Sequence, residues 1–212
     1  QELDYWLKKS PNKISPLPFD YPNGSNTVEY ADSVLVSLSI EESKALLQDV
    51  PTISHTQIND VLLTALVQSF TSWTGEDSLL LDLEGHGRET ISDDINITRT
   101  VGWFTTIFPV LLSLEGISQT EDALKAIKEQ LQNIPNKGIG YGVLRYLNQN
   151  PSTRTQLQTF PQAEVRFYYL GQLDQMLPES SLFKLSNQSV GNSRSLRSNR
   201  RYLLDINGFV LG

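Results

Sequence analysis

The stretch that most constrains the fold is SLLLDL at residues 78–83, which runs directly into the polar motif EGHGRE at residues 84–89. The aliphatic run does not alternate with polar residues, and this is typical of a strand that is buried on both faces. Other predicted strands intermix with predicted helices along the chain, at irregular spacing. The sequence therefore predicts an α/β fold, a two-layer sandwich with a mixed β-sheet.

Local periodicity gives the remaining elements. We expect helices over residues 3–9, 40–50, 55–75, 120–134 and 138–149, and a proline-containing linker over residues 10–27. We expect strands over residues 28–39, 78–83, 105–114, 165–170 and 202–211, with a weaker candidate at 182–185. The strand at 28–39 depends on the alternation of Val34, Val36 and Leu38 with serine.

Several residues predict element ends and buried faces. Ser39 with Glu42 three positions later has the pattern of a capping box. Gly75 is expected to end helix 55–75, and Pro109 indicates an edge strand or a bulge. The expected inward stripes are Ile58, Leu62, Ala65, Leu66, Ser69 and Trp73 in helix 55–75, and Leu124, Ile127, Leu131 and Ile134 in helix 120–134.

Composition excludes several classes of site. The 212 residues carry a net charge of −7, which argues against a nucleic-acid partner. The sequence has no cysteine, which excludes thiolate metal ligands and thiolate nucleophiles. No apolar run is long enough to cross a membrane and no signal peptide is evident, so we expect a cytoplasmic protein without a membrane partner. The late arginines indicate either a solvated loop or a surface for an acidic partner; they are Arg194, Arg197, Arg200 and Arg201.

Glu84 is the first candidate for chemistry, because it follows the aliphatic strand and precedes two nearby glycines. It shares a strand face with Asp82, and Gly85 and Gly87 allow a sharp turn or a close approach of a ligand. A carboxylate at the edge of an apolar core can serve as a general acid or base. The alternative is a hydrogen-bonded glutamate that ends a strand.

His86 and Arg88 lie in the same motif. No metal site is predicted, because the only other histidine is His55 and no metal-binding spacing joins the two. His86 is therefore expected to be a hydrogen-bonding turn residue. Arg88 is expected to pair with Asp82, Glu89 or Asp93 and to fix the loop.

Two further stretches are dense in aromatic residues and glycine, NITRTVGWFTTIFPVLL from residue 96 and VRFYYLGQ from residue 165. In the first, Gly102 indicates a tight backbone crossing beneath an aromatic lid. The alternative is a loop anchored in the core by Trp103 and Phe104. No phosphate-binding loop and no serine-nucleophile motif is present.

Five motifs taken in order resemble one family. LDLEGHGRE, RTVGWFTTIFPVLL and FYYLGQ, with NDVLLTAL and KGIGYGVLRYL between or before them, resemble the C-terminal half of an epimerization domain of non-ribosomal peptide synthetases. The resemblance runs over residues 5–212. It implies a chloramphenicol acetyltransferase-like lobe, one of a V-shaped pair. Because the chain opens without Met and closes on an apolar run, we expect residues 1–212 to be a piece of a longer polypeptide, truncated at both ends.

The resemblance implies an isomerase that inverts the α-carbon of an aminoacyl or peptidyl thioester by deprotonation and reprotonation. No cofactor is expected to bind directly, because the substrate is carried on the 4′-phosphopantetheine of a peptidyl carrier domain. The implied partners are that carrier domain, an N-terminal lobe and neighbouring synthetase domains. The implied setting is antibiotic or other secondary-metabolite peptide biosynthesis by a multidomain enzyme.

The resemblance also implies the site. Glu84 matches the family's catalytic glutamate, and the residues expected to line or brace the cavity are Gly85, His86, Gly87, Arg88, Arg99, Thr100, Gly102, Trp103, Tyr168 and Tyr169. Two departures stand out. The family's paired-histidine motif is absent, so the lobe alone is expected to be inactive. Tyr168 replaces the usual asparagine, which fits an inactive or divergent domain as well.

Two other functions stay open at this point. A condensation domain, which forms peptide bonds between carrier-bound substrates, uses the same fold. A non-catalytic module that docks carrier domains is the second alternative, and Tyr168 favours it.

Overall fold

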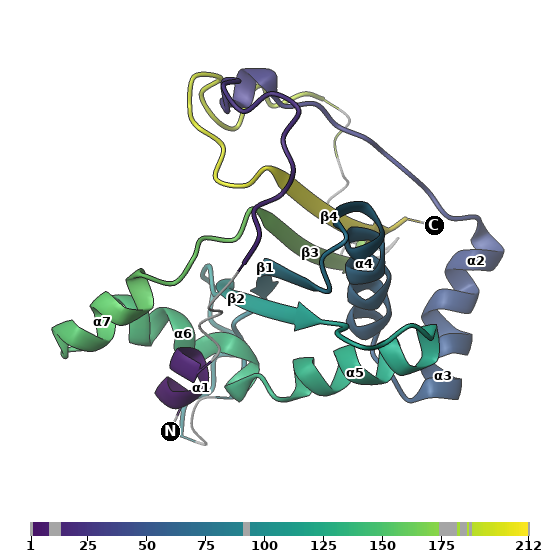
Figure 1. Cartoon of the computed structure of the whole chain (residues 1–212), viewed down its shortest axis with the longest axis horizontal. Coiled ribbons are helices and arrows are strands. Elements are labelled where there is room, and N and C mark those ends of the chain that lie inside the picture. Colours follow the sequence, from purple (N-terminus) through teal and green to yellow (C-terminus); the bar gives the residue numbers. More distant parts are fainter. Residues whose placement is uncertain are drawn as a thin grey trace.

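The structure is a computed structural model that describes residues 2–8, 14–90, 94–173, 182, 186 and 188–211. Its sheet contains four strands in the order β2-β1-β3-β4 (Figure 1). The strands are β1 (Ser78–Gly85), β2 (Thr106–Ser113), β3 (Val165–Gln172) and β4 (Leu204–Val210). Strand β1 is antiparallel to β2 and parallel to β3, and β3 is parallel to β4. The predicted mixed sheet is confirmed.

Helices and strands follow one another irregularly along the chain. They are α1 (Glu2–Lys8), α2 (Ile40–Lys44), α3 (Val50–Ser54), α4 (Ile58–Thr74), α5 (Thr120–Gln132), α6 (Ile139–Gly142) and α7 (Pro151–Gln158). A π-helical turn, Ala45–Asp49, joins α2 to α3, and another, Val143–Leu147, follows α6. Within the described segments, no helix combines the length and the apolar character that a bilayer crossing needs.

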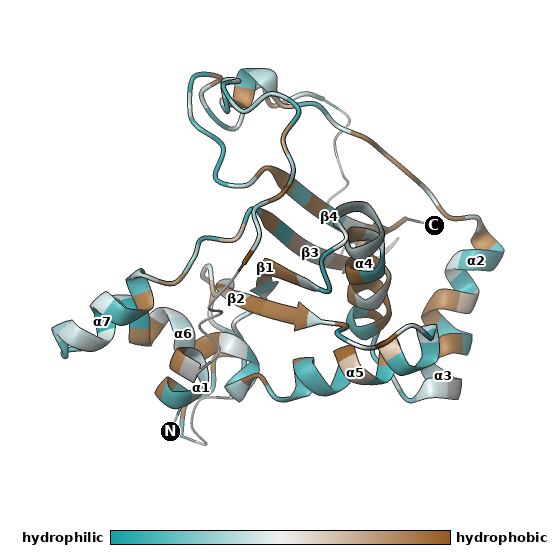
Figure 2. Cartoon of the chain, in the orientation of Figure 1, coloured by the Kyte–Doolittle hydropathy of each residue, from teal (hydrophilic) through white to brown (hydrophobic). Residues whose placement is uncertain are grey.

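One face of the sheet makes the core. Strand β1 presents Leu79, Leu81 and Leu83 to a buried cluster, and Leu81 is 0% exposed. Helices α4 and α5 supply the facing side chains, namely Leu63, Val67, Phe70, Ala123 and Ile127. Figure 2 shows the strands as mostly hydrophobic and much of α5 as hydrophilic. Each buried leucine contributes roughly 1.5–3 kcal/mol relative to exposure, so burial on this face stabilises the fold.

The helix predicted over residues 55–75 contains α4, and the predicted stripe is right only in part, because Leu62 and Leu66 pack against the core. Gly75 ends the helix with φ 75°, as expected. The buried residues are Asp60, Leu63, Thr64, Val67 and Phe70, whereas Ala65, Ser69 and Trp73 of the predicted stripe are exposed. Both stripes have helical spacing, and the buried one contains Asp60 and Thr64, whose polarity concealed it. Asp60 accepts a bond from the Gln57 amide and Thr64 donates to the Asp60 carbonyl, so both are satisfied when buried.

The strand predicted at 28–39 is wrong. Val28–Tyr30 forms a short 3₁₀ helix, and residues 31–39 are extended without belonging to the sheet (Figure 1). Val34 is 92% exposed and Val36 is 85% exposed. Alternation alone does not make a strand, since backbone pairing also requires a free neighbouring edge.

Other local predictions hold. Ser39 and Glu42 form both bonds of a capping box at the start of α2. Pro109 lies in β2, which is an edge strand. Of the stripe predicted for helix 120–134, Ile127 and Ile134 are buried. Helix α7 was not predicted, because PSTRTQLQ has little apolar periodicity and buries only Thr153 and Leu157. Of the weak strand candidate at 182–185, residues 183–185 lie outside the described part of the chain.

Candidate functional site

Glu84 is the penultimate residue of β1 and lies on the sheet face opposite to Leu81 and Leu83. Its side chain is 9% exposed, and its Oε1 atom lies 2.7 Å from Nη1 of Arg166 on the neighbouring strand β3. A short, charge-assisted contact of this kind fixes the direction of a carboxylate. The glutamate is therefore held in place rather than free in a turn.

Arg166 joins three strands on this face. It is the register partner of Asp82 in β1 and of Asp205 in β4. Its Nε atom donates to Asp205 Oδ1 at 2.8 Å, and its Nη2 atom donates to Asp205 Oδ2. Sequence reasoning missed this residue and Asp205. The available signal was a charged side chain near the start of each of two apolar strands.

Asp82 lies deeper on the same face. It accepts a hydrogen bond from the Tyr202 hydroxyl at 2.7 Å and lies 3.4 Å from Nη2 of Arg201. Burial raises the pKa of Asp82, and the bond from Tyr202 and the nearby arginines oppose that shift. Burial and the Asp82 carboxylate also raise the pKa of Tyr202. The two groups together keep a proton in this buried pair more firmly than either would in water.

The glycine-rich turn after β1 is tightly packed. Gly87 has φ 67°, and a Cβ atom there would lie 1.5 Å from the Phe104 carbonyl oxygen. A Cβ atom at Gly85 would lie 3.0 Å from Thr106 Oγ1. The glycines therefore let the turn approach the 104–106 backbone, which no other residue type would allow at Gly87.

Arg88 fixes the loop through backbone carbonyls among the described residues, and Asp93, one of its three predicted partners, lies outside them. Its Nη1 and Nη2 atoms donate to the carbonyls of Ile97 and Thr100 at 3.0 and 3.1 Å. Its guanidinium also lies 4.3 Å from the centroid of the Phe104 ring. Because Arg88 is a long planar donor, it can reach two backbone carbonyls across the loop at once.

His86 is bonded within the turn. Its Nδ1 atom accepts from the Arg88 amide at 2.9 Å, and its Nε2 atom lies 3.1 Å from Glu89 Oε1. Lys137 Nζ reaches the other Glu89 oxygen at 3.2 Å. Among the described residues, no three His, Asp or Glu side chains gather in a way that could hold a metal ion.

Residues 98–103 of the stretch NITRTVGWFTTIFPVLL lie at the surface, before the chain enters β2. Arg99 and Thr100 are exposed, and Thr100 provides its carbonyl to Arg88. A Cβ atom at Gly102 would lie 3.1 Å from the Phe104 ring, while Trp103 itself is 91% exposed. The alternative of a core anchor is therefore wrong for Trp103.

The two adjacent tyrosines of VRFYYLGQ point to opposite faces of β3. Tyr168 follows Arg166 by two positions and so shares its face with Glu84. Tyr169 packs against the hydrophobic core on the other face and is the register partner of Gly208. Strand alternation thus brings Tyr168, but not Tyr169, to the face of the predicted site.

A cavity of about 350 Å³ lies beside Asp82. It is lined by Thr105, Tyr141, Arg145, Tyr146 and Arg201, among others. Arg145 Nη1 donates to the Tyr141 hydroxyl at 2.6 Å. A larger cavity of about 450 Å³, lined by Leu17, Phe70 and Glu164, contains none of the predicted site residues.

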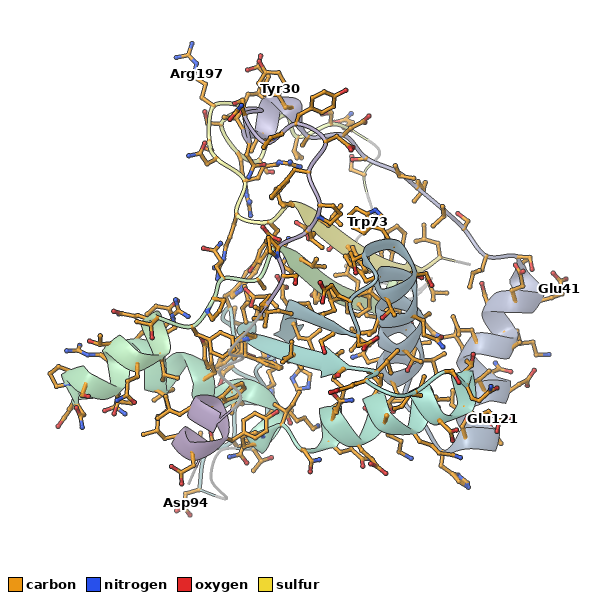
Figure 3. The ribbon with its side chains drawn as sticks, viewed as in Figure 1. Tyr30, Glu41, Trp73, Asp94, Glu121 and Arg197 are labelled. Carbon is orange, nitrogen blue, oxygen red and sulfur yellow. The ribbon has the colours of Figure 1, made fainter. Side chains whose placement is uncertain are left out.

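The late arginines do not form one surface. Arg201 reaches Asp82, and Arg200 Nε donates to Asn26 Oδ1 at 2.9 Å. Arg194 and Arg197 are exposed, and Figure 3 shows Arg197 pointing away from the molecule. The solvated-loop interpretation therefore fits two of the four late arginines, Arg194 and Arg197.

A family model described as "Condensation domain" matches residues 1–212. One of the linear gramicidin synthase proteins of Brevibacillus parabrevis is 46% identical over 213 residues, covering 100% of this chain and 3% of that protein. Surfactin synthase subunit 1 of Bacillus subtilis (strain 168) is 37% identical, covering 99% of this chain and 6% of that protein. The chain thus spans a small part of each of these relatives.

Solved structures give a similar result. The epimerization domain from the third module of tyrocidine synthetase B matches with a TM-score of 0.86 and 34% identity, covering 99% of this chain and 46% of that chain. The condensation domain from the Monacolin K polyketide synthase MokA matches in fold alone, with a TM-score of 0.58 and 13% identity, covering 81% of this chain and 41% of that chain. The predicted mixed α/β, chloramphenicol acetyltransferase-like fold is confirmed.

Proposed function

The chain belongs to the condensation-domain family, and on that basis we propose that it is the C-terminal lobe of an epimerization domain in a non-ribosomal peptide synthetase. The observation that carries the proposal is Glu84, a nearly buried carboxylate held at the end of a central strand by Arg166. The 34% identity to an epimerization domain over 99% of this chain supports the same assignment.

The proposed reaction moves one proton off and back onto an α-carbon. The thioester carbonyl acidifies the α-proton of an aminoacyl or peptidyl group on the phosphopantetheine arm of a carrier domain. Glu84 exchanges that proton on one face of the carbon, typically an effect of about 10²–10⁴ in rate. An acid or base on an N-terminal lobe serves the other face, so the net result is an inverted stereocentre.

The turn after Glu84 gives the substrate its approach. Gly85 and Gly87 bring the backbone against residues 104–106, and Arg88 ties that loop to the turn. Tyr168 lies on the face of Glu84, where it would border the substrate, and Trp103 presents its ring to solvent beyond the turn. These residues position and enclose the substrate, while Glu84 carries the proton.

Peptide-bond formation is the second candidate, because the matching family model is described as a condensation domain. The two functions give different products from the same carrier-bound substrates. A dipeptidyl thioester indicates condensation, whereas an inverted α-carbon without a new bond indicates epimerization. Carrier binding with neither product indicates a docking module.

The test replaces Glu84 by Gln in the complete synthetase protein. The measurement is incorporation of solvent deuterium at the α-carbon of a carrier-bound aminoacyl thioester, followed by chiral analysis of the released amino acid. We expect exchange to fall by about 10²-fold or more. Glu89→Gln, on the same turn but bonded to His86 and Lys137, is the matched control. Unchanged exchange in Glu84→Gln contradicts the proposal.

A further inference from the structure

We propose that Arg166 and Asp205 are positioning residues that set the direction of the Glu84 carboxylate during proton exchange. This inference rests on the proposed function, in which Glu84 carries the proton. It concerns the row Glu84–Arg166–Asp205, which crosses β1, β3 and β4 on one sheet face.

The Arg166 guanidinium is held from one side by Asp205. Asp205 occupies the side formed by Nε and Nη2, with the Nε to Oδ1 distance at 2.8 Å. Because a guanidinium is planar and rigid, that fork fixes where Nη1 points. Nη1 then donates to Glu84 Oε1 at 2.7 Å. The carboxylate of Asp205 thus determines the direction of a bond made two strands away.

The backbone also fixes the row. Arg166 and Asp205 are register partners, and Arg166 also lies opposite Asp82, two residues before Glu84. Diagonal neighbours across paired strands are within reach of long side chains. The ring of Tyr202 lies 5.4 Å from the Arg166 guanidinium, and the Tyr202 hydroxyl is tied to Asp82. The arginine is therefore supported along its face as well as at its end.

The two oxygens of the Glu84 carboxylate have different surroundings. Within the described residues, Glu84 is bonded through Oε1, and no donor is found for Oε2. Side-chain exposure falls along the row, from 42% at Asp205 to 19% at Arg166 and 9% at Glu84. The bonded oxygen anchors the group, and the other oxygen is the one that would take the α-proton. Loss of the anchor would let the carboxylate rotate away from a geometry that exchange requires.

The test measures deuterium exchange on the carrier-bound aminoacyl thioester in the complete protein, with kcat and KM for the carrier determined separately. We expect Arg166→Met to lower kcat by about 10²-fold with KM changed less than twofold. Arg166→Lys should be nearly as impaired, because it keeps the charge but has no fork. Asp205→Asn should lower kcat by about tenfold. Arg154→Met on α7 is the matched arginine control, and circular dichroism confirms that each variant is folded.

Asp205→Asn is the second variant if Arg166→Met fails to fold. Adding Asp205→Asn to Arg166→Lys should cost no further rate, because the fork is already lost. The positioning role is overturned if Arg166→Lys keeps the wild-type kcat. It is also overturned if the loss of activity in Arg166→Lys comes entirely from a higher KM while kcat stays constant. The two proposals fail separately. Retained exchange in Glu84→Gln removes the proposed function, whereas exchange lost in Glu84→Gln but kept in Asp205→Asn and Arg166→Met removes only this inference.

Discussion

Leu81 and Asp82 are neighbours in β1 and both are buried, but their side chains enter two different environments. Leu81 packs among apolar side chains between the sheet and the α4 and α5 helices. Asp82 is surrounded by Tyr202, Arg201 and Arg166 on the other face. The first environment is stabilised by removal of apolar surface from water, and the second by hydrogen bonds between charged groups.

The two faces of the sheet differ in how well they can hold a functional side chain. An apolar face is insensitive to the direction of any one side chain, provided that the volume is filled. A charged face depends on each partner, because one lost partner leaves a buried charge without compensation. Glu84 belongs to the second face, so its direction is set by specific groups. Variants on the two faces should therefore fail in different ways.

The largest effect on stability is expected for Leu81→Ala. Leu81 is fully buried, so the variant should lose about 2–5 kcal/mol of unfolding free energy through lost transfer and a cavity. Urea unfolding followed by far-ultraviolet circular dichroism measures this. Val34→Ala is the control, because Val34 is 92% exposed and should change stability by less than about 0.5 kcal/mol. Equal losses in both variants would contradict the division of the two faces.

Gly87→Ala should have the next largest effect, because it affects the turn through which β1 leaves the core. The left-handed φ of 67° alone costs an alanine about 1–2 kcal/mol, and its Cβ would also overlap the Phe104 carbonyl. We expect a loss of about 2 kcal/mol or more in unfolding free energy, measured by urea unfolding. Gly142→Ala is the control, since no atom lies within 4 Å of its Cβ position. A Gly87→Ala protein as stable as the control would show that the 104–106 backbone can move away.

The sequence predicted the apolar face well. The aliphatic run at 78–83 placed β1 inside the sheet, and glycine and proline marked the end of α4 and the edge strand β2. These signals can be read from a few neighbouring residues. A strand buried on both faces requires apolar residues, and a left-handed backbone position favours glycine. The same logic failed for residues 28–39, where alternation gave no information about whether a partner strand is present.

The charged face was harder to predict. Glu84 stood out through its motif, but Arg166 and Asp205 lie 82 and 121 positions further along the chain, and nothing local connects them. Their pairing depends on the strand order β1-β3-β4, a tertiary property that periodicity does not contain. Tyr169 illustrates the reverse case, in which membership of a motif predicted a site residue that alternation directs into the core.

A smaller effect, and one confined to the charged face, is expected from Asp82→Asn. Burial raises the pKa of Asp82 above its ordinary 3.8. The folded protein therefore binds the Asp82 proton more tightly than the unfolded protein does. The contribution of Asp82 to stability is complete below the unfolded pKa and is lost as pH rises through the folded pKa. Wild type should therefore lose stability relative to Asp82→Asn as the pH rises above the ordinary Asp82 pKa of 3.8.

Asparagine keeps an acceptor for Tyr202, so the comparison isolates the charge. Urea unfolding at several pH values gives the difference between the two proteins. Asp122→Asn, at an exposed pair with Lys125 on α5, is the matched carboxylate control. A difference for Asp82→Asn that grows in favour of wild type as pH rises would mean that Tyr202 and the arginines outweigh burial.

The smallest effect on folding is expected for Trp103→Ala. Trp103 is 91% exposed, so its removal should change the unfolding free energy by less than about 0.5 kcal/mol. Phe104→Ala is the matched aromatic control. It should cost more, because Phe104 is half-buried beneath Arg88. Urea unfolding and acrylamide quenching of tryptophan fluorescence measure these effects, since Trp103 should contribute the most quenchable emission. A large loss of stability in Trp103→Ala would place its ring within the fold, whereas slower deuterium exchange at unchanged stability would place it with Glu84 at the substrate.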